Sequence, residues 1–344
     1  MLPLCTRYAM NCGYVFILLA TLFFSSMEVA LKTVAYDFHP MQLNCTRFFI
    51  GGLLLIPFGM RALKKRGVSL DLDAWKGFAG LGFLGLVVSM MLYQVSILYV
   101  PASVVSVLFS CNPVLVLAFA FLILRTDIRP QHIIALVLEV LGALVIIDPL
   151  HTTLDMRGVT LVLLSAATFA LYAVLGKKLC SRYSGLAVTS FSCVAASVEM
   201  LLIMALSHAA PVAEVLRSIG LPLFAEIPFM QGYTSGNILT VLYICIFVTG
   251  GGYACYFMGM ERTSPMQGSL VFFFKPILAP LLAMFILGEA ISWNMWVGIA
   301  LILVASLISM LPTLHALHHI PHLHIHFPHH FHRPDWMHFP HRRK

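Results

Sequence analysis

The chain has 344 residues, of which 60% are hydrophobic and 10% charged, and its mean hydropathy is +0.92. A soluble domain keeps about a quarter of its residues charged to cover its surface, so this composition excludes a water-soluble globular fold. The net charge of +7 comes from Lys and Arg in short segments between apolar runs. No basic face with interleaved aromatic residues is visible, and we therefore expect no nucleic-acid partner.

Ten apolar segments are long enough to cross a hydrocarbon core as helices that rise about 1.5 Å per residue. They span residues 13–34, 43–60, 77–98, 102–124, 131–148, 158–176, 186–207, 238–259, 266–288 and 292–311. The first exceeds the apolar part of a signal peptide, so we expect it to remain as a span. The sequence predicts an all-α integral membrane protein with ten transmembrane helices in a lipid bilayer.

The basic residues alternate between the two sides of this arrangement. With a cytoplasmic N-terminus, sixteen of the 21 lie in inner segments, while only Arg157 and Arg217 lie outside and Lys32, Arg47 and Lys275 lie within spans. Cytoplasmic loops carry an excess of Lys and Arg. We therefore expect a multi-pass protein of the plasma (inner) membrane with both termini in the cytoplasm.

The two halves of the chain repeat each other. A shift of 163 positions lays the fourth and fifth spans on the ninth and tenth, and identical pairs include Ser106–Ser269, Phe109–Phe272, Pro113–Pro276 and Ala120–Ala283. Each half holds five helices, so the second copy must be inverted in the membrane. We expect one repeat over 13–148, a second over 158–311 and a tail over 312–344. Inverted repeats are typical of transporters, whose substrate site lies near the bilayer midplane.

Polar side chains within spans mark the candidate site, since a charge at a helix centre costs about 2.5–3.5 kcal/mol. Asn112 and Lys275 each precede a proline at equivalent positions of the repeat, where we expect paired helix breaks. The candidate substrate-binding residues are Lys275, Asn112, Gln94, Gln267 and Tyr93. In the alternative interpretation the prolines are packing kinks, and Lys275 pairs with a buried carboxylate such as Glu139 or Glu199.

Further charged residues in the spans are candidates for ion coupling or ion pairing, namely Glu28, Lys32, Arg47, Glu139 and Glu199. Glu28 and Lys32 are four residues apart on one helix face and can neutralise each other. Arg47 would extend that pair into a small network. The three glycines at 250–252 either allow close helix packing or unwind the eighth helix around a ligand.

The C-terminal tail is rich in histidine, with 11 in the 30 residues from His315 to Lys344. Clustered neutral imidazoles chelate divalent metals, and the candidate ligands are His318, His319, His322, His324 and His326. Two interpretations stay open: a disordered chelating or pH-sensitive tail, and a dedicated metal sensor. No cofactor is expected.

Two stretches resemble the EamA family of the drug/metabolite transporter superfamily. The first is SSMEVALKTVAYDFHPMQLNCTRFF, and the second is PILAPLLAMFILGEAISWNMWVGIALIL. The matching residues are Lys32, Pro40, Arg47 and Phe48 in the first, and Pro276, Leu287–Glu289, Trp296 and Gly298 in the second. The first repeat departs from the pattern, with Leu-Arg-Thr at 124–126 where the Leu-Gly-Glu turn is expected. The resemblance implies an inverted 5+5 repeat and transport of amino acids, drugs or other metabolites without ATP.

The sequence thus favours a secondary transporter, and specifically an exporter, of a small metabolite such as an amino acid or a drug-like solute, working by alternating access between two inverted halves. One alternative is a divalent-metal exporter with a metal-binding tail, although the spans hold almost no His or Asp. Another is a membrane enzyme or a helical scaffold, although no nucleophile–base pair or HExxH motif appears.

Overall fold

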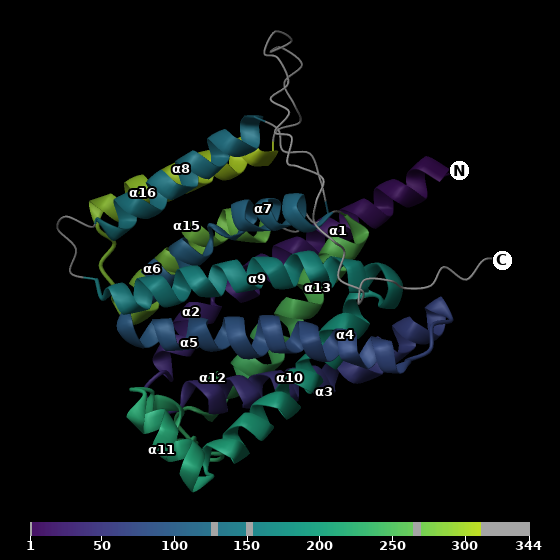
Figure 1. Cartoon of the computed structure of the whole chain (residues 1–344). Helices are drawn as coiled ribbons and strands as arrows, with labels where there is room; N and C mark the ends of the chain where they lie inside the picture. Colours follow the sequence, from purple (N-terminus) through teal and green to yellow (C-terminus); the bar gives the residue numbers. More distant parts are fainter. Residues whose placement is uncertain (1, 125–129, 149–153, 264–269, 311–344) are drawn as a thin grey trace, which may run out of the picture. The chain divides into compact units, whose positions relative to one another are not determined.

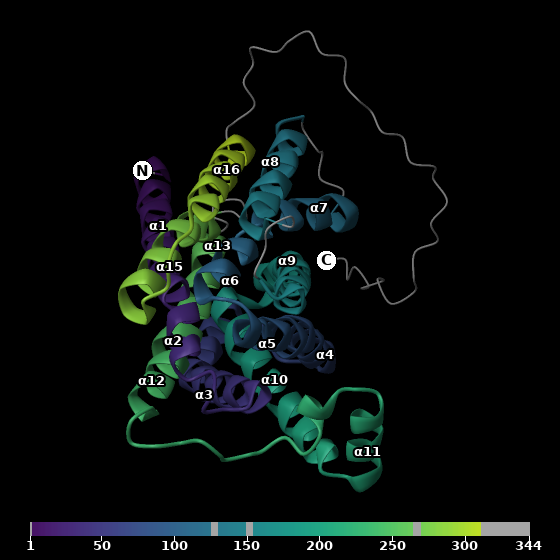
Figure 2. The same cartoon turned by 90° about the vertical axis from the view of Figure 1, so that its left-hand side faces the viewer.

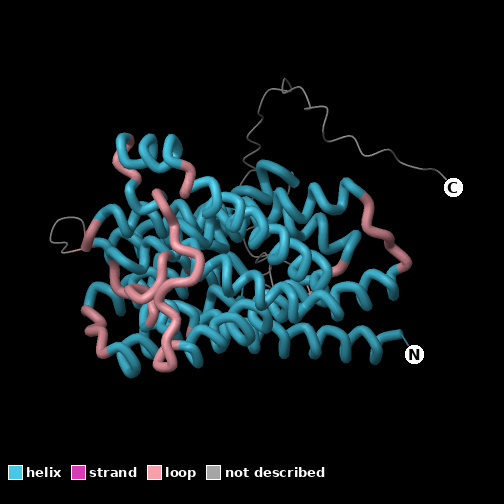
Figure 3. The backbone as a smooth tube through the Cα atoms, turned by 90° about the horizontal axis from the view of Figure 1, so that it is seen from below, coloured by secondary structure: helices cyan, strands magenta, loops and turns pink. Residues whose placement is uncertain are grey.

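A computed structural model describes the backbone of residues 2–124, 130–148, 154–263 and 270–310 and, from Gly13 onward, most of their side chains. Every regular element in these ranges is a helix (Figures 1 and 3), and they contain no strand. The prediction of an all-α fold is confirmed. The helices described below all belong to the compact unit that ends at Met310.

The first half of the chain forms α1 (Leu2–Ser25), α2 (Met27–Thr33), α3 (Pro40–Arg66), α4 (Leu72–Gly82), the π-helix η1 (Phe83–Ser89), α5 (Met90–Tyr99), α6 (Ala102–Phe109), α7 (Asn112–Leu124) and α8 (Pro130–Ile147). The second half forms α9 (Met156–Tyr183), α10 (Gly185–Ser207), α11 (Ala210–Ser218), the 3₁₀ turn η2 (Pro222–Phe224), α12 (Ile238–Tyr243), the π-helix η3 (Ile244–Gly252), α13 (Tyr253–Arg262), α15 (Leu270–Leu287) and α16 (Trp293–Met310). The short helix α11, which the sequence analysis did not predict, lies at one end of the bundle beyond α10 (Figure 2).

Seven helical segments of the described chain are long and apolar enough to cross a membrane. They are Gly13–Thr33, Pro40–Arg66, Leu72–Tyr99, Ala102–Ile123, Met156–Tyr183, Gly185–Ser207 and Ile238–Arg262. Three shorter apolar helices, Ile133–Ile147, Phe274–Leu287 and Trp293–Ile308, coincide with the other three predicted spans. The chain is therefore a multi-pass membrane protein.

Local chemistry sets the ends of α3. Pro40 occupies its first turn, where a missing N–H costs nothing, and Nδ1 of His39 accepts the Met41 N–H at 3.1 Å as the N-cap. At the other end Gly67 adopts φ 63°, a left-handed conformation that glycine tolerates best. Burial lowers the pKa of His39, in keeping with a neutral ring whose Nε2 contacts the Leu223 carbonyl at 2.7 Å.

The helices of the two halves pack in matching combinations. The second helix of each half, α3 and α10, lie against each other, as do the fifth helices, α8 and α16 (Figure 1). The fourth helices meet through α6 and α15. The first helix of one half, α1, packs on α13 of the other, and α9 correspondingly packs on α5.

Both halves also carry a π-helical segment in their third helix. A shift of η1 by 163 positions places it inside η3, so the irregularity itself repeats. The backbone of η1 approaches its neighbour closely, because a Cβ built on Gly85 would lie 2.1 Å from the Tyr172 ring. The three glycines at 250–252 lie at the end of η3 and inside a continuous helical segment.

Pro113 and Pro276, at equivalent positions of the repeat, differ in whether the helix is interrupted beside them. A turn at Ser110 and Cys111 separates α6 from α7, and Pro113 lies in the first turn of α7, where it breaks no hydrogen bond. Helix α15, in contrast, continues through both Pro276 and Pro280. The expected break is present in the first half only. A membrane helix tolerates internal prolines where neighbouring protein groups satisfy the freed carbonyls.

Candidate functional site

A buried ion pair stands at the centre of the candidate site. Lys275 Nζ on α15 lies 2.5 Å from Glu28 Oε1 on α2, and their side chains are 1% and 0% exposed. The hydroxyl of Tyr93 on α5 donates to the same carboxylate oxygen. The structure thus brings together one predicted coupling residue and two predicted substrate-binding residues. Lys275 therefore pairs with a buried carboxylate, as the alternative interpretation held, but that carboxylate is Glu28 and not Glu139 or Glu199.

Aromatic rings enclose this ion pair. Lys275 Nζ lies 4.9 Å from the ring centroid of Phe109 and 5.6 Å from that of Tyr93, so its charge faces two π-systems. Phe109 continues the shell to Phe169 and Phe272, with ring centroids 5.3 and 6.0 Å apart. Apolar rings around a charge lower the effective dielectric constant and so strengthen the charge interactions between them.

Arg47 on α3 is fully buried and has no carboxylate partner in the part of the chain that the structure describes. Its Nη1 contacts the Met27 sulfur at 3.7 Å, while Nε and Nη2 have no hydrogen-bond acceptor. Tyr93 and Tyr253 are near enough to interact with it electrostatically. The expected network between Arg47 and Glu28 is therefore absent, because Glu28 is already paired with Lys275. Arg47 is thus a buried guanidinium with two nitrogens that have no acceptor among the described residues.

Lys32 does not neutralise Glu28 either. It lies in the last turn of α2, and its ammonium donates to the Ile97 carbonyl at 2.6 Å. That carbonyl belongs to the last turn of α5, where the helix leaves acceptors unpaired and a cation is favoured. Lys32 is therefore a helix-capping residue, while Glu28 points inward.

The other predicted site residues have no hydrogen bond or ion pair with Glu28 or Lys275 among the described residues. Asn112 Nδ2 donates to the Ala166 carbonyl at 2.9 Å, which joins α7 to α9. Gln94 is buried on α5, and its Oε1 has no partner. Glu139 is buried on α8 beside Ser306, and Glu199 is half-buried on α10. Gln267 and the tail residues His318, His319, His322, His324 and His326 lie outside the described residues.

Glu289 is a functional candidate that the polar-in-span criterion missed, because it follows α15 in a connecting segment. Its carboxylate accepts the backbone N–H groups of Ala102 at 2.8 Å and Ser103 at 3.0 Å, and the Ser103 hydroxyl at 2.7 Å. A carboxylate at a helix N-terminus satisfies orphan donors and the helix dipole. The signal was the Leu-Gly-Glu turn, which the family resemblance had singled out.

Metal ligands do not gather in the part of the chain that the structure describes. Within those ranges no group of three or more His, Cys, Asp or Glu side chains is placed to hold an ion. The arrangement there offers a different chemistry: a neutralised ion pair, one guanidinium with free donors and an aromatic lining.

Known proteins resemble this chain over most of its length. An uncharacterized transporter of Clostridium kluyveri is 31% identical over 308 residues, which cover 87% of this chain and 93% of that protein. Protein PecM of Dickeya dadantii is 26% identical over 68% of this chain and 73% of its own length. A crystal structure at 19% identity has the same fold, with a TM-score of 0.61 over 88% of this chain and 96% of that one.

A family model described as the EamA-like transporter family matches residues 11–148 and again residues 156–311. The two matches fall on either side of the connection between α8 and α9. The predicted family is confirmed, and its members are transporters. This chain belongs to the EamA-like transporter family.

Proposed function

We propose that the protein is a secondary transporter that exports a small metabolite bearing a carboxylate, such as an amino acid, by alternating access between two inverted five-helix halves. The family supports transport. The matched helix packing and the two equivalent π-helices support the division into halves. Rocking of such halves exposes a midplane site to each side in turn.

The proposed substrate class, a solute with a carboxylate, rests on the buried guanidinium of Arg47. An unpaired charge inside a membrane protein costs several kcal/mol and persists where a function requires it. Arginine presents a planar fork that binds a carboxylate through two parallel hydrogen bonds, and Nε and Nη2 are the donors without acceptors. In this proposal the substrate carboxylate binds Arg47, and the aromatic shell receives its apolar part.

The Glu28–Lys275 pair supplies the coupling step in this proposal. A proton bound to Glu28 would cancel the attraction that holds Lys275, and the pair joins α2 of the first half to α15 of the second. Loss of that attraction would let the halves separate. Protonation from one side and release to the other would then drive the solute against its gradient.

For the orientation we propose a plasma (inner) membrane location with both termini in the cytoplasm. The distribution of basic residues supports it, since sixteen lie on the proposed inner side and two on the outer. Membrane-impermeant labelling of single cysteines tests it. Labelling of a cysteine placed in the Lys64–Arg66 segment from outside intact cells would overturn the orientation.

Flux through proteoliposomes tests the proposed function. We expect exchange of radiolabelled L-amino acids and no exchange of the matching amines, which lack the carboxylate. Arg47→Gln should abolish exchange, and Arg47→Lys should retain part of it, because the charge remains and the fork is lost. Arg157→Gln, which removes a charge from the exposed start of α9, is the matched control. Uptake of amines or of Zn²⁺ in place of carboxylates would overturn the substrate class.

A further inference from the structure

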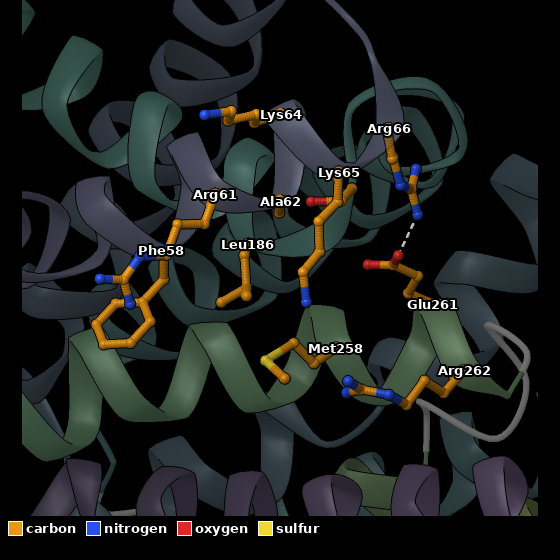
Figure 4. Close-up of a pocket in the computed structure, with 11 residues that line it drawn as sticks. Phe58, Arg61, Ala62, Lys64, Lys65, Arg66, Leu186, Met258, Glu261 and Arg262 are labelled. Carbon is orange, nitrogen blue, oxygen red and sulfur yellow. Dashed lines mark hydrogen bonds and ion pairs between the residues drawn. The ribbon is translucent and has the colours of Figure 1, made fainter.

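A basic pocket lies where α3 and α13 end and α10 begins (Figure 4), and its lining includes neither Glu28 nor Lys275. Its volume is about 710 Å³. Five basic residues line it, namely Arg61, Lys64, Lys65, Arg66 and Arg262, against a single carboxylate, that of Glu261. In Figure 4 the side chain of Lys65 extends from α3 toward Met258, while Arg262 lies along α13. The lining therefore favours an anion.

The one carboxylate of the pocket is fully engaged. Glu261 pairs with Arg66 through Oε1 and accepts the Gly185 N–H, the first of α10, at 2.7 Å through Oε2. The remaining four basic side chains have no carboxylate within 4 Å among the described residues. Their positive charge is uncompensated, and Arg262 is held in place over the Phe16 ring at 4.5 Å.

An apolar stripe leads into this basic end. Leu54, Phe58, Arg61 and Lys65 follow one another at four-, three- and four-residue steps, which places them on one face of α3. Leu54 and Phe58 are 47% and 52% exposed, although both are large and apolar. Along this face the surface changes from apolar to basic within about three helical turns. A soluble anion would use only the basic end of such a surface.

We propose that the basic pocket binds the phosphate headgroup of an anionic phospholipid, whose acyl chain lies along α3 over Phe58 and Leu54. Basic pockets between helices at the membrane surface recognise such headgroups. The apolar residues followed by basic residues along α3 match the acyl chain and headgroup of a phospholipid. The positive charge of the pocket matches the negative charge of the phosphate. This lipid site is independent of the proposed substrate and of the direction of transport.

Native mass spectrometry of the purified full-length protein tests this site, with phosphatidylglycerol and phosphatidylcholine of identical acyl chains as probes. We expect tighter retention of phosphatidylglycerol. Removing a basic residue at a membrane surface weakens such binding about fivefold, so Arg61→Gln, Lys65→Gln and Arg262→Gln together should weaken it on the order of a hundredfold. The matched control, Lys76→Gln, Lys177→Gln and Lys178→Gln, removes three basic charges from residues that do not line the pocket.

Two further measurements distinguish the binding of a lipid from the binding of a free anion. Phe58→Gln keeps every charge and should still weaken phosphatidylglycerol binding several-fold, because it disrupts the acyl-chain path. Excess inorganic phosphate should fail to displace the lipid. Displacement by phosphate with no effect of Phe58→Gln would show a soluble-anion site and overturn the proposal. An equal loss in the control triple variant would show non-specific attraction and would also overturn it.

Discussion

Removing one partner of the Glu28–Lys275 pair should destabilise the fold far more than removing both. The side chains are almost fully buried and 2.5 Å apart. Leaving one charge of such a pair alone costs about 3–5 kcal/mol, whereas an apolar replacement of both is often neutral. Glu28→Leu should show the full penalty, because Lys275 keeps only its contacts with the Tyr93 and Phe109 rings. Lys275→Met should cost less, because Tyr93 still donates to Glu28.

A double-mutant cycle measures this coupling by equilibrium unfolding in mixed micelles of sodium dodecyl sulfate and dodecyl maltoside. The variant with Glu28→Leu and Lys275→Met should be more stable than Glu28→Leu alone, with a coupling energy of at least about 2 kcal/mol. Lys178→Met, a change at an exposed lysine, should leave the free energy of unfolding unchanged. If the double variant loses as much free energy of unfolding as the two single variants together, the two residues are not coupled and the prediction is wrong. Proteoliposome flux by that variant at the wild-type rate would separately exclude Glu28 from coupling.

Three other changes have defined outcomes. Gly85→Ala should destabilise the protein by about 1–3 kcal/mol, because its Cβ would meet the Tyr172 ring; Gly80→Ala, with open space around its Cβ, is the control in the same unfolding assay. Because burial lowers the pKa of His39, this side chain takes up a proton at a higher pH in the unfolded chain than in the folded protein. The contribution of the neutral ring to the free energy of unfolding is therefore complete above pH 6.5, and it declines as the pH falls from 6.5 through the folded pKa. The apparent Tm should therefore drop below pH 6.5, and His39→Asn should reduce that drop. Glu289→Gln should lower the Tm, because a neutral amide binds the Ala102 and Ser103 N–H groups less strongly, and an unchanged Tm would contradict that role.

The spans could be predicted because hydropathy is a local property of the sequence. Helix starts agreed best, and α6 begins at the predicted residue, Ala102. Helix ends in basic residues were predicted too early, since α3 continues to Arg66, six residues beyond the predicted end at 60. The family followed from short motifs for the same reason. Tyr93 and Lys275, both predicted as substrate-binding residues, lie close to each other in the structure, and their role in substrate binding stays a prediction.

Pairings between distant helices could not be predicted in this way. Glu28 and Lys275 lie in different halves of the chain, and the carboxylates considered for Lys275 were chosen by their depth in other spans. The partner depends on how α2 meets α15, which no periodicity encodes. The pairing of Glu28 with Lys32 failed for a related reason, because the end of α5 offers Lys32 a carbonyl that sequence spacing does not reveal.

A π-helix immediately precedes each of the helices that carry Tyr93 and Tyr253. Helix η1 runs directly into α5, which carries Tyr93, and η3 runs directly into α13, which begins at Tyr253. A π turn holds one more residue than an α turn, so converting η1 to the α pattern changes the phase of α5 by about 100°. Such a turn would carry the Tyr93 hydroxyl away from Glu28 without bending the helix. A change in backbone hydrogen bonding can thus make or break a contact at the ion pair.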